Sequence, residues 1–311
     1  MRNDCAVANG HPIGPAASPM RLTNDEYHAR PEVSKSDLDL IARCPAKYKW
    51  HKIDGNPRAG STTFDLGSLV HCLILEPNMV QREFMKAPAD APRRPSSTQR
   101  KAAKPSASTQ QAIEFWDQFD KESEGKTILS ADDWEQAERM AASVAQHPAV
   151  QLIFDGDGVA EESFFWTDEA TGLDCKCRPD WHSNDREVVV DLKTTRNAGH
   201  EFERSLVNFR YHVQAAHYTD GCAAAWGKAP SHFMFICVEK EPPYPVAVYL
   251  ASPDVIAAGR RQARKDLERL AECRRTHRWP GYGDEIKVLD LPAWMKNKDN
   301  AYTDSTFDLL F

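Results

Sequence analysis

The sequence Arg178-Pro179-Asp180, followed after a short turn by Val188-Val189-Val190-Asp191-Leu192-Lys193, decides the fold. Residues 187–195 carry a β-branched run that predicts a strand, and residues 173–181 predict a second strand before it. The Ser-Asn-Asp sequence between the two has the composition of a turn. We therefore expect an antiparallel hairpin that places Asp180 nearly opposite Asp191.

The charged side chains of this hairpin form a pattern that suits a divalent cation. Side chains two apart on a strand share a face, so Asp191 and Lys193 point the same way, with the Leu192 carbonyl between them. The Cβ atom of Asp180, on the neighbouring strand, would lie about 5 Å from that of Asp191. Two carboxylates that close repel unless a cation lies between them, and oxygen ligands suit Mg²⁺ or Mn²⁺. Lys193 would orient or polarise an attacking water, or stabilise charge on a phosphate.

The composition excludes some classes of protein. The chain has 311 residues, 41% of them hydrophobic, so one large domain or two small ones can form a core. The formal net charge of −7 argues against a generally basic nucleic-acid binder, although clustered charge matters more than the total. The sequence has no signal-peptide pattern and no run of the roughly twenty apolar residues that span a membrane. We therefore expect the eight cysteines to be free thiols in a reducing cytoplasm.

Hydrophobic periodicity predicts helices before and after the hairpin. Residues 64–75 have apolar side chains at helical spacing, and Gly67 and His71 share a face because they are four apart. Gly67 costs helix stability, so it indicates close approach by another backbone or a ligand. Another predicted helix begins at a cap formed by Ser34 or Ser36, is interrupted by Pro45 and continues over residues 46–51. Further helices are predicted at residues 130–146, with Ser130 as the cap, over most of 206–226, and at 254–273. Further strands are predicted near Val159 and at residues 161–166, 231–238 and 246–250.

We expect one domain, residues 21–295, with a helical N-terminal elaboration. Residues 1–20 lack periodicity and indicate a flexible leader, and residues 296–311 form an acidic and apolar tail. Residues 86–108 are a predicted flexible insertion with six basic residues against one acidic residue. This insertion is interpreted either as a solvated loop or as a mobile arm that touches phosphates.

Four motifs occur in the order found in RecB-type nucleases. They are Gly67-Ser68-Leu69-Val70-His71, Arg178-Pro179-Asp180, Asp191-Leu192-Lys193-Thr194-Thr195 and Tyr211-His212-Val213-Gln214-Ala215-Ala216-His217-Tyr218. The chain resembles the RecE-like branch, the phage exodeoxyribonuclease VIII proteins with a PD-(D/E)XK nuclease domain, from about Ser34 to Trp294. This resemblance implies an α/β fold, in which a central mixed β-sheet is flanked by helices.

The resemblance also assigns roles by position. His71 matches a histidine that ligates the metal from a helix. Asp180 matches the first acidic motif, and Asp191 and Lys193 match the second. The Leu192 carbonyl would complete the coordination of Mg²⁺, with Mn²⁺ as the alternative metal.

Gln214 and Tyr218 match a Q-x-x-x-Y motif. They are four apart and share a helix face, and Tyr211 lies one turn earlier on the same side. The resemblance implies that they hydrogen-bond phosphate oxygens or hold the lysine in position.

An acidic residue earlier in the chain is usual in this fold. Glu161 and Glu162 are both available, on opposite faces of a predicted strand. Glu161 is preferred because Ser163 and Phe165 would share its face, but the sequence leaves both open.

Each of these residues also has an ordinary structural interpretation. An acid and a lysine two apart can lie on the wet face of any hairpin. A single helical histidine such as His71 is usually a core or surface residue, and Tyr211 and Tyr218 can be core aromatics. The four motifs in order outweigh these alternatives.

The resemblance implies a magnesium-dependent exodeoxyribonuclease. Such an enzyme is a phosphodiester hydrolase that degrades linear double-stranded DNA from 5′ ends and leaves 3′ single strands for recombination. The resemblance further implies a phage protein in the cytoplasm of a bacterial host, without membrane attachment. A ring-shaped homo-oligomer and a RecT-like single-strand annealing partner would accompany this activity.

Two other functions are compatible with the same motifs. One is an endonuclease or repair nuclease of the same fold, and the other is an inactive DNA-binding recombination factor. The complete set of acids and lysine argues against the inactive factor. Some RecB-type relatives hold an iron–sulphur cluster on one early and three late cysteines, but Cys44 has only Cys273 as a late counterpart. We therefore expect no cluster.

Overall fold

A computed structural model of the protein describes residues 20–56, 62–283 and 285–291. The predicted leader up to residue 19 and the predicted tail 296–311 lie outside these ranges. The chain divides into a unit that ends at Trp279 and a second unit that begins at Pro280. The described residues of the second unit form no helix or strand. No helix in the described ranges combines the length and the apolar character needed to cross a lipid bilayer.

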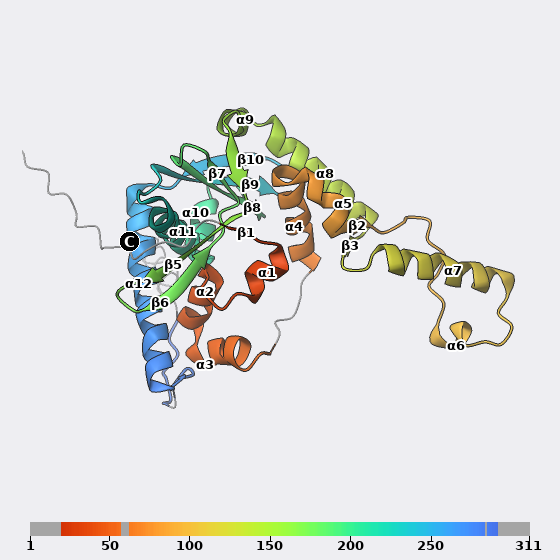
Figure 1. Ribbon diagram of the computed structural model, residues 1–311, viewed down its shortest axis with the longest axis horizontal. Helices are drawn as coiled ribbons and strands as arrows, with labels where there is room; N and C mark the ends of the chain where they lie inside the picture. Colours follow the sequence, from red (N-terminus) through yellow and green to blue (C-terminus); the bar gives the residue numbers. More distant parts are fainter. Residues whose placement is uncertain (1–19, 57–61, 284, 292–311) are drawn as a thin grey trace, which may run out of the picture. The chain divides into compact units, whose positions relative to one another are not determined.

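A five-stranded sheet lies at the centre of the first unit (Figure 1). Two of its neighbouring strands run parallel and the other pairs are antiparallel, so the predicted central mixed sheet is confirmed. In spatial order the strands are β10 (Val246–Leu250), β9 (His232–Glu239), β8 (Val188–Thr195), β7 (Trp181–Ser183) and β4 (Gly158–Ala160).

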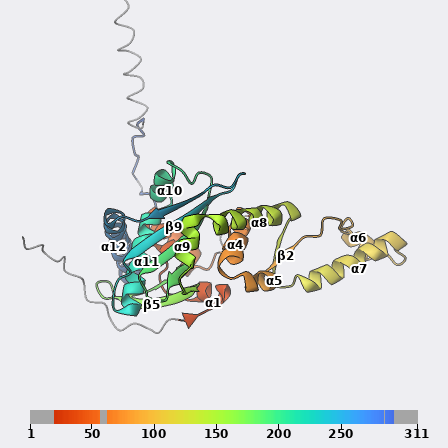
Figure 2. The same ribbon diagram turned by 90° about the horizontal axis from the view of Figure 1, so that it is seen from above.

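Two of the inner strands, β8 and β9, are buried on both faces, as their apolar runs require. Side chains alternate between faces, so Val190 and Ile236 join one hydrophobic cluster while Val189 and Phe235 join another. Helices cover both faces, and Figure 2 shows α8 and α12 on opposite sides of the sheet. The first cluster includes α4 (Thr62–Leu75), α8 (Ala131–Gln146) and α9 (Pro148–Phe154); the second includes α10 (Phe202–Asn208) and α11 (Tyr211–Trp226), with α12 (Pro253–Thr276) packed on α11.

The predicted hairpin exists, but its first strand is shorter than expected. β7 pairs with β8 in antiparallel register, with Trp181 opposite Val190. The prediction of one continuous strand over residues 173–181 is wrong, because its first half belongs to a separate three-stranded sheet. Pro179 lies at the break, and it has no amide hydrogen to donate to a strand ladder. The separate sheet has the order β1 (Met20–Arg21), β5 (Glu162–Asp168) and β6 (Leu173–Cys177).

Short helices before α4 form the predicted helical N-terminal elaboration. Ser34 is the N-cap of the second of them, and its amide donates to Asp37 Oδ2 at 2.9 Å. Leu38 and Ile41 are fully buried in a third cluster that also contains Leu270 of α12. The elements are α1 (Asn24–Ala29), α2 (Lys35–Arg43), α3 (Pro45–Tyr48) and a π-helical turn (Lys49–Ile53).

Helix α4 lies close to β8 at Gly67. A Cβ atom at this position would lie 3.4 Å from Thr194 Oγ1, so the protein atom that approaches Gly67 belongs to a side chain rather than to another backbone. The helix ends before Pro77, as predicted. A 3₁₀ turn (Pro77–Met79) and α5 (Val80–Glu83) follow.

Residues 86–108 lead into a helix that the sequence analysis did not predict. Arg94 pairs with Asp120 at 2.8 Å and Arg100 pairs with Asp117 at 2.6 Å, both acids being on that helix. These pairs offset part of the basic charge, which weakens the interpretation of a phosphate-binding arm. The elements here are β2 (Phe84–Lys86), α6 (Ser97–Arg100), α7 (Ala107–Glu122) and β3 (Thr127–Leu129), which pairs with β2 in parallel.

Candidate active site

Three potential metal ligands converge from separate elements. His71 is on α4, Glu161 lies between β4 and β5, and Asp180 lies between β6 and β7. One ligand atom from each lies within 4.8 Å of the other two. Both acids occupy points where the chain crosses from one sheet to the other, and the amide of Glu161 donates to the Asp180 carbonyl at 3.1 Å. The two crossings therefore hold the acids together.

Asp180 is the most buried of the three ligands. Its Oδ2 accepts a hydrogen bond from the Leu192 amide at 2.5 Å and lies 3.4 Å from His71 Nδ1. Burial raises the pKa of Asp180 to about 6, although Lys193 and the Leu192 amide act to lower it. The positive groups around Asp180 therefore do not fully offset the effect of burial, and an added positive charge would lower the pKa of this carboxyl further.

His71 is neutral at physiological pH. Desolvation by the surrounding protein, reinforced by Lys193, lowers its pKa to about 4, while the Leu192 backbone and Asp191 act to raise it. A neutral imidazole has a lone pair available for a metal. The structure thus places the predicted histidine, His71, next to the backbone of Leu192.

Glu161, rather than Glu162, lies at this centre. Its backbone has φ 54°, outside the strand, so the expected alternation of faces along a strand did not apply to it. Burial, and then the neighbouring Asp180, raise the pKa of Glu161 to about 8, while Arg178 lowers it. Arg178 Nε lies 2.9 Å from Glu161 Oε2. Glu162 instead contacts His182 Nε2 at 2.9 Å.

Asp191 and Lys193 form a pair next to the three ligands. Lys193 contacts Asp191 Oδ2, and Gln214 Nε2 donates to Asp191 Oδ1 at 2.5 Å. Burial raises the pKa of Asp191 to about 6, against the effect of Lys193. Burial acts to lower the pKa of Lys193, but Asp191 and Asp180 outweigh it and the pKa is raised. Lys193 therefore stays charged, and Asp191 faces it rather than joining the three-ligand group.

Tyr211, rather than Tyr218, contacts the lysine. Lys193 Nζ lies 4.7 Å from the centroid of the Tyr211 ring, which is a cation–π distance. Tyr218 packs against Phe233, and burial raises its pKa well above the usual value, with Asp191 and Asp180 contributing. Tyr218 is therefore near the acids while its ring belongs to the core.

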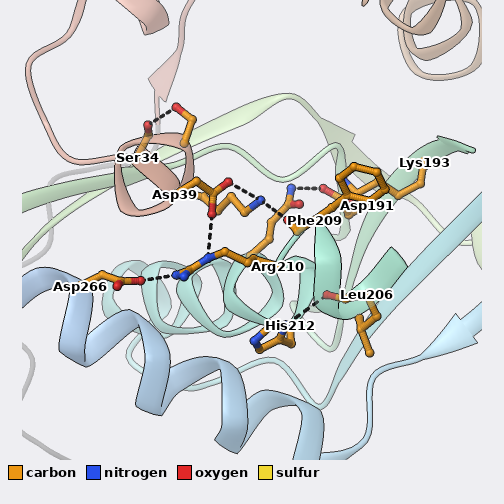
Figure 3. A network of polar contacts seen from close by, with 12 residues as sticks. Ser34, Asp39, Asp191, Lys193, Leu206, Phe209, Arg210, His212 and Asp266 are labelled. Atoms are coloured by element: carbon orange, nitrogen blue, oxygen red, sulfur yellow. Dashed lines mark hydrogen bonds and ion pairs between the residues drawn. The ribbon is translucent and has the colours of Figure 1, made fainter. Parts of the chain in front are cut away.

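A separate polar network near this pair joins α2, the start of α11 and α12 (Figure 3). Lys35 Nζ donates to the Phe209 carbonyl at 2.8 Å and pairs with Asp39 at 2.7 Å. Arg210, in the left-handed region at φ 56°, contacts Asp39 at 3.1 Å and also pairs with Asp266. Lys35 and Arg210 carry no sequence motif that indicates this contact, since only the tertiary fold brings these residues together.

A family model described as a PDDEXK-like domain of unknown function (DUF3799) matches residues 34–292. The chain belongs to this family. No curated protein sequence matches it. Its fold is similar to that of a "Putative exonuclease" from Eubacterium rectale, with a TM-score of 0.57, 15% identity, and coverage of 90% of this chain and 98% of the other. The crystal structure of SSO0001 covers 67% of this chain and 87% of the SSO0001 chain at 12% identity, and its TM-score of 0.28 is too low to indicate a shared fold.

The donor set of this PDDEXK-like domain fits a divalent cation. An imidazole nitrogen and carboxylate oxygens are available on His71, Glu161 and Asp180. Burial raises the pKa of both acids of this set, and the neighbouring Asp180 adds to the rise for Glu161 by charge repulsion. A cation between them would remove this repulsion and lower both pKa values.

Proposed function

We propose that this protein is a divalent-metal-dependent nuclease that hydrolyses phosphodiester bonds of DNA. The observation that carries the proposal is the convergence of His71, Glu161 and Asp180 beside the Asp191–Lys193 pair. Family membership supports it, because the chain matches a PDDEXK-like domain over residues 34–292. Asp180, Asp191 and Lys193 are the residues that we propose as its PD-(D/E)XK motif. Mg²⁺ is the proposed metal, and Mn²⁺ is the alternative.

The residues of the site have two roles in the proposed reaction, which are metal binding and contact with the phosphate. His71, Glu161 and Asp180 would hold the cation, with Asp191 and the Leu192 carbonyl next to them. A bound cation would neutralise the negative charge that develops on the phosphate and would activate the nucleophile. Lys193 orients the attacking water and donates to the phosphate oxygens, as its raised pKa keeps it protonated.

Gln214 acts on the reaction through Asp191. Its amide donates to one carboxylate oxygen of Asp191 while Lys193 contacts the other. This contact fixes the carboxylate and thereby the lysine, which is one of the two roles expected for the Q-x-x-x-Y motif. Tyr218, predicted to share this role, supports the packing beneath the acids.

We further propose that the substrate is linear double-stranded DNA, degraded from 5′ ends to leave 3′ single strands for recombination. The order of the four motifs supports this, since it is that of RecE-like enzymes. The same resemblance supports a single domain over residues 21–295, a ring-shaped oligomer, a RecT-like partner and a phage protein working in the bacterial cytoplasm.

Digestion of end-labelled linear duplex tests the proposal directly. With Mg²⁺ we expect loss of label from 5′ ends first, and with EDTA we expect no digestion. A covalently closed circle is the matched substrate: a strict exonuclease leaves it intact and an endonuclease nicks it. Intact linear duplex at every metal tested would refute nuclease activity.

Replacing Lys193 tests the assigned chemistry. Lys193→Ala and Asp191→Ala should each reduce the digestion rate by roughly a hundred- to a thousandfold, because a charged donor to the reacting phosphate is lost or misplaced. Circular dichroism should show an unchanged fold. Digestion at the wild-type rate by either variant would remove that residue from the reaction.

A further inference from the structure

We propose that a pocket on the N-terminal helices binds unpaired nucleotides of a DNA strand beside the candidate active site. The pocket has a volume of about 460 Å³ and is lined by residues of α2, α3 and the π-helical turn. This volume suits one or two nucleotides, since small-molecule sites range from about 300 to 1,000 Å³. The inference rests on the proposed nuclease function, because it assigns a second contact to the same substrate.

Trp50 supplies an exposed aromatic surface in this pocket. Trp50 is 56% exposed, which is unusual for a large apolar residue next to a cavity. The backbone that carries Trp50 is fixed, since the Asn56 side chain and amide donate to the Trp50 carbonyl at 3.0 and 3.2 Å. Lys49 and Asp54, paired at 2.7 Å, hold the ends of the same turn. An indole on a fixed turn is a stacking surface for a nucleobase.

The charge of the pocket suits phosphates. Arg43 and Lys47, both exposed, line the same cavity as Trp50. Asp39 also lines it, but its carboxylate pairs with Lys35 and Arg210 and is thereby neutralised. An anionic strand therefore meets the positive charge of Arg43, and the one acid among these lining residues is already paired.

The pocket connects to the reacting centre through α2. Lys35, Asp39 and Arg43 are spaced four apart and so lie along one face of that helix. Lys35 Nζ is 5.8 Å from the centroid of the Tyr211 ring, and Lys193 Nζ is 4.7 Å from the same centroid. Figure 3 shows Asp39, Phe209, Asp191 and Lys193 in the same region of the molecule. A strand whose phosphate lies at Lys193 can therefore run past Lys35 toward Arg43.

Unpaired nucleotides fit this surface better than duplex. A single indole stacks on the free face of a splayed base, and bases inside a duplex have no free face. Stacking is tolerant of sequence, which suits an enzyme that must process any DNA end. The pocket would thus hold the strand that becomes single at the point of cleavage.

Fluorescence anisotropy with a labelled oligothymidylate of about ten nucleotides tests the proposal, with EDTA present to prevent hydrolysis. Trp50→Ala should weaken binding about tenfold or more, the range expected for loss of one stacked base, and Trp50→Phe should lose less. Leu152→Ala on α9 is the matched control, as it removes an apolar side chain that is 78% exposed elsewhere.

The charge contribution is measured separately. Arg43→Ala should weaken binding and reduce the slope of log affinity against log salt by about 0.7, as expected for one lost phosphate contact on a single strand. Arg139→Ala, on an exposed position of α8, is its control and should leave the slope unchanged.

An abasic oligonucleotide of the same length distinguishes stacking from phosphate binding. The wild type should bind it more weakly than oligothymidylate, and the Trp50→Ala variant should bind both alike. Equal affinity of wild type and Trp50→Ala for oligothymidylate would overturn the proposal, whether or not linear duplex is digested. Trp50-dependent binding without any digestion would keep the pocket and refute the nuclease function alone.

Discussion

Arg178 and Lys193 supply positive charge to carboxylates that burial would otherwise protonate. Lys193 was predicted from its motif, because its spacing from Asp191 is fixed by the strand period. Arg178 belongs to the same quoted stretch, but its partner Glu161 is in another part of the chain and cannot be read from spacing. The choice between Glu161 and Glu162 likewise depended on a left-handed residue at a sheet crossing.

Arg178 should set the pH range of activity. Arg178→Ala removes the charge that lowers the pKa of Glu161, so this carboxyl should stay protonated to higher pH and bind the cation less well. We expect activity at neutral pH to fall about ten- to a hundredfold and the acid limb of the pH–rate profile to move to higher pH. Arg178→Lys should keep most of the charge effect.

The matched control for this prediction is Arg204→Ala, which removes an arginine whose side chain is 81% exposed. Its pH–rate profile should coincide with that of the wild type. An unshifted acid limb in Arg178→Ala would mean that Arg178 does not act through Glu161.

At the scale of helices and strands, local signals predicted the starts of α2 and α8 from their serine caps, and the end of α4 from Pro77. The strand 173–181 was wrong because its apolar alternation continues through Pro179 while its hydrogen-bond partners change there. Sheet membership depends on distant strands, and no local pattern encodes it. Helix α7 was missed because it follows a Pro-rich basic stretch that was interpreted as loop.

Packing of α11 against α12 should be essential to the site. Gly259 of α12 approaches so closely that a Cβ atom would lie 1.9 Å from the His212 carbonyl oxygen. Gly259→Ala should lower the free energy of unfolding by about 2 kcal/mol or more, despite the better helix propensity of alanine. Activity should fall too, since α11 carries Tyr211 and Gln214.

Gly156→Ala provides the comparison, because a Cβ atom there meets nothing within 4 Å. Its free energy of unfolding should stay within about 0.5 kcal/mol of the wild type in urea denaturation. An equally small change in Gly259→Ala would contradict the prediction, because it would mean that α11 and α12 can move apart without loss of stability or activity.

For the whole molecule, Mg²⁺ binding should stabilise the folded state. A cation at a hundred times its Kd adds about 2.7 kcal/mol to the free energy of unfolding. Asp180→Asn removes a buried charge that repels Glu161, so this variant should melt at higher temperature than wild type in EDTA. It should also lose the Mg²⁺-dependent rise in melting temperature.

Differential scanning calorimetry with and without Mg²⁺ measures both effects. The Arg204→Ala variant should behave as wild type in each condition. A full Mg²⁺ shift in Asp180→Asn would place the cation elsewhere.

Lys176 should make stability depend on alkaline pH. Its Nζ donates to the Tyr27 and Arg30 carbonyls, and burial lowers its pKa from 10.5 to about 8. Between these values the folded state has released the proton while the unfolded state retains it, so stability rises with pH. Wild type should gain up to roughly 3 kcal/mol relative to Lys176→Met over this window.

Urea denaturation of both proteins near pH 8 and near pH 10 gives the two free energies of unfolding. Their difference, rather than either value, isolates Lys176, because buried cysteines and tyrosines also titrate in this range. A pH-independent difference would show that the ammonium group is not desolvated in the folded state.

The two crossings between the sheets have a consequence for the newly made chain. Glu161 and Asp180 meet when β4 pairs with β7 and β5 pairs with β6, whereas His71 arrives from α4, far away in sequence. A chain in which α4 has not yet packed against the sheet therefore has no complete three-ligand group. Under the proposed nuclease function, cleavage of DNA would therefore begin only once the tertiary structure is complete.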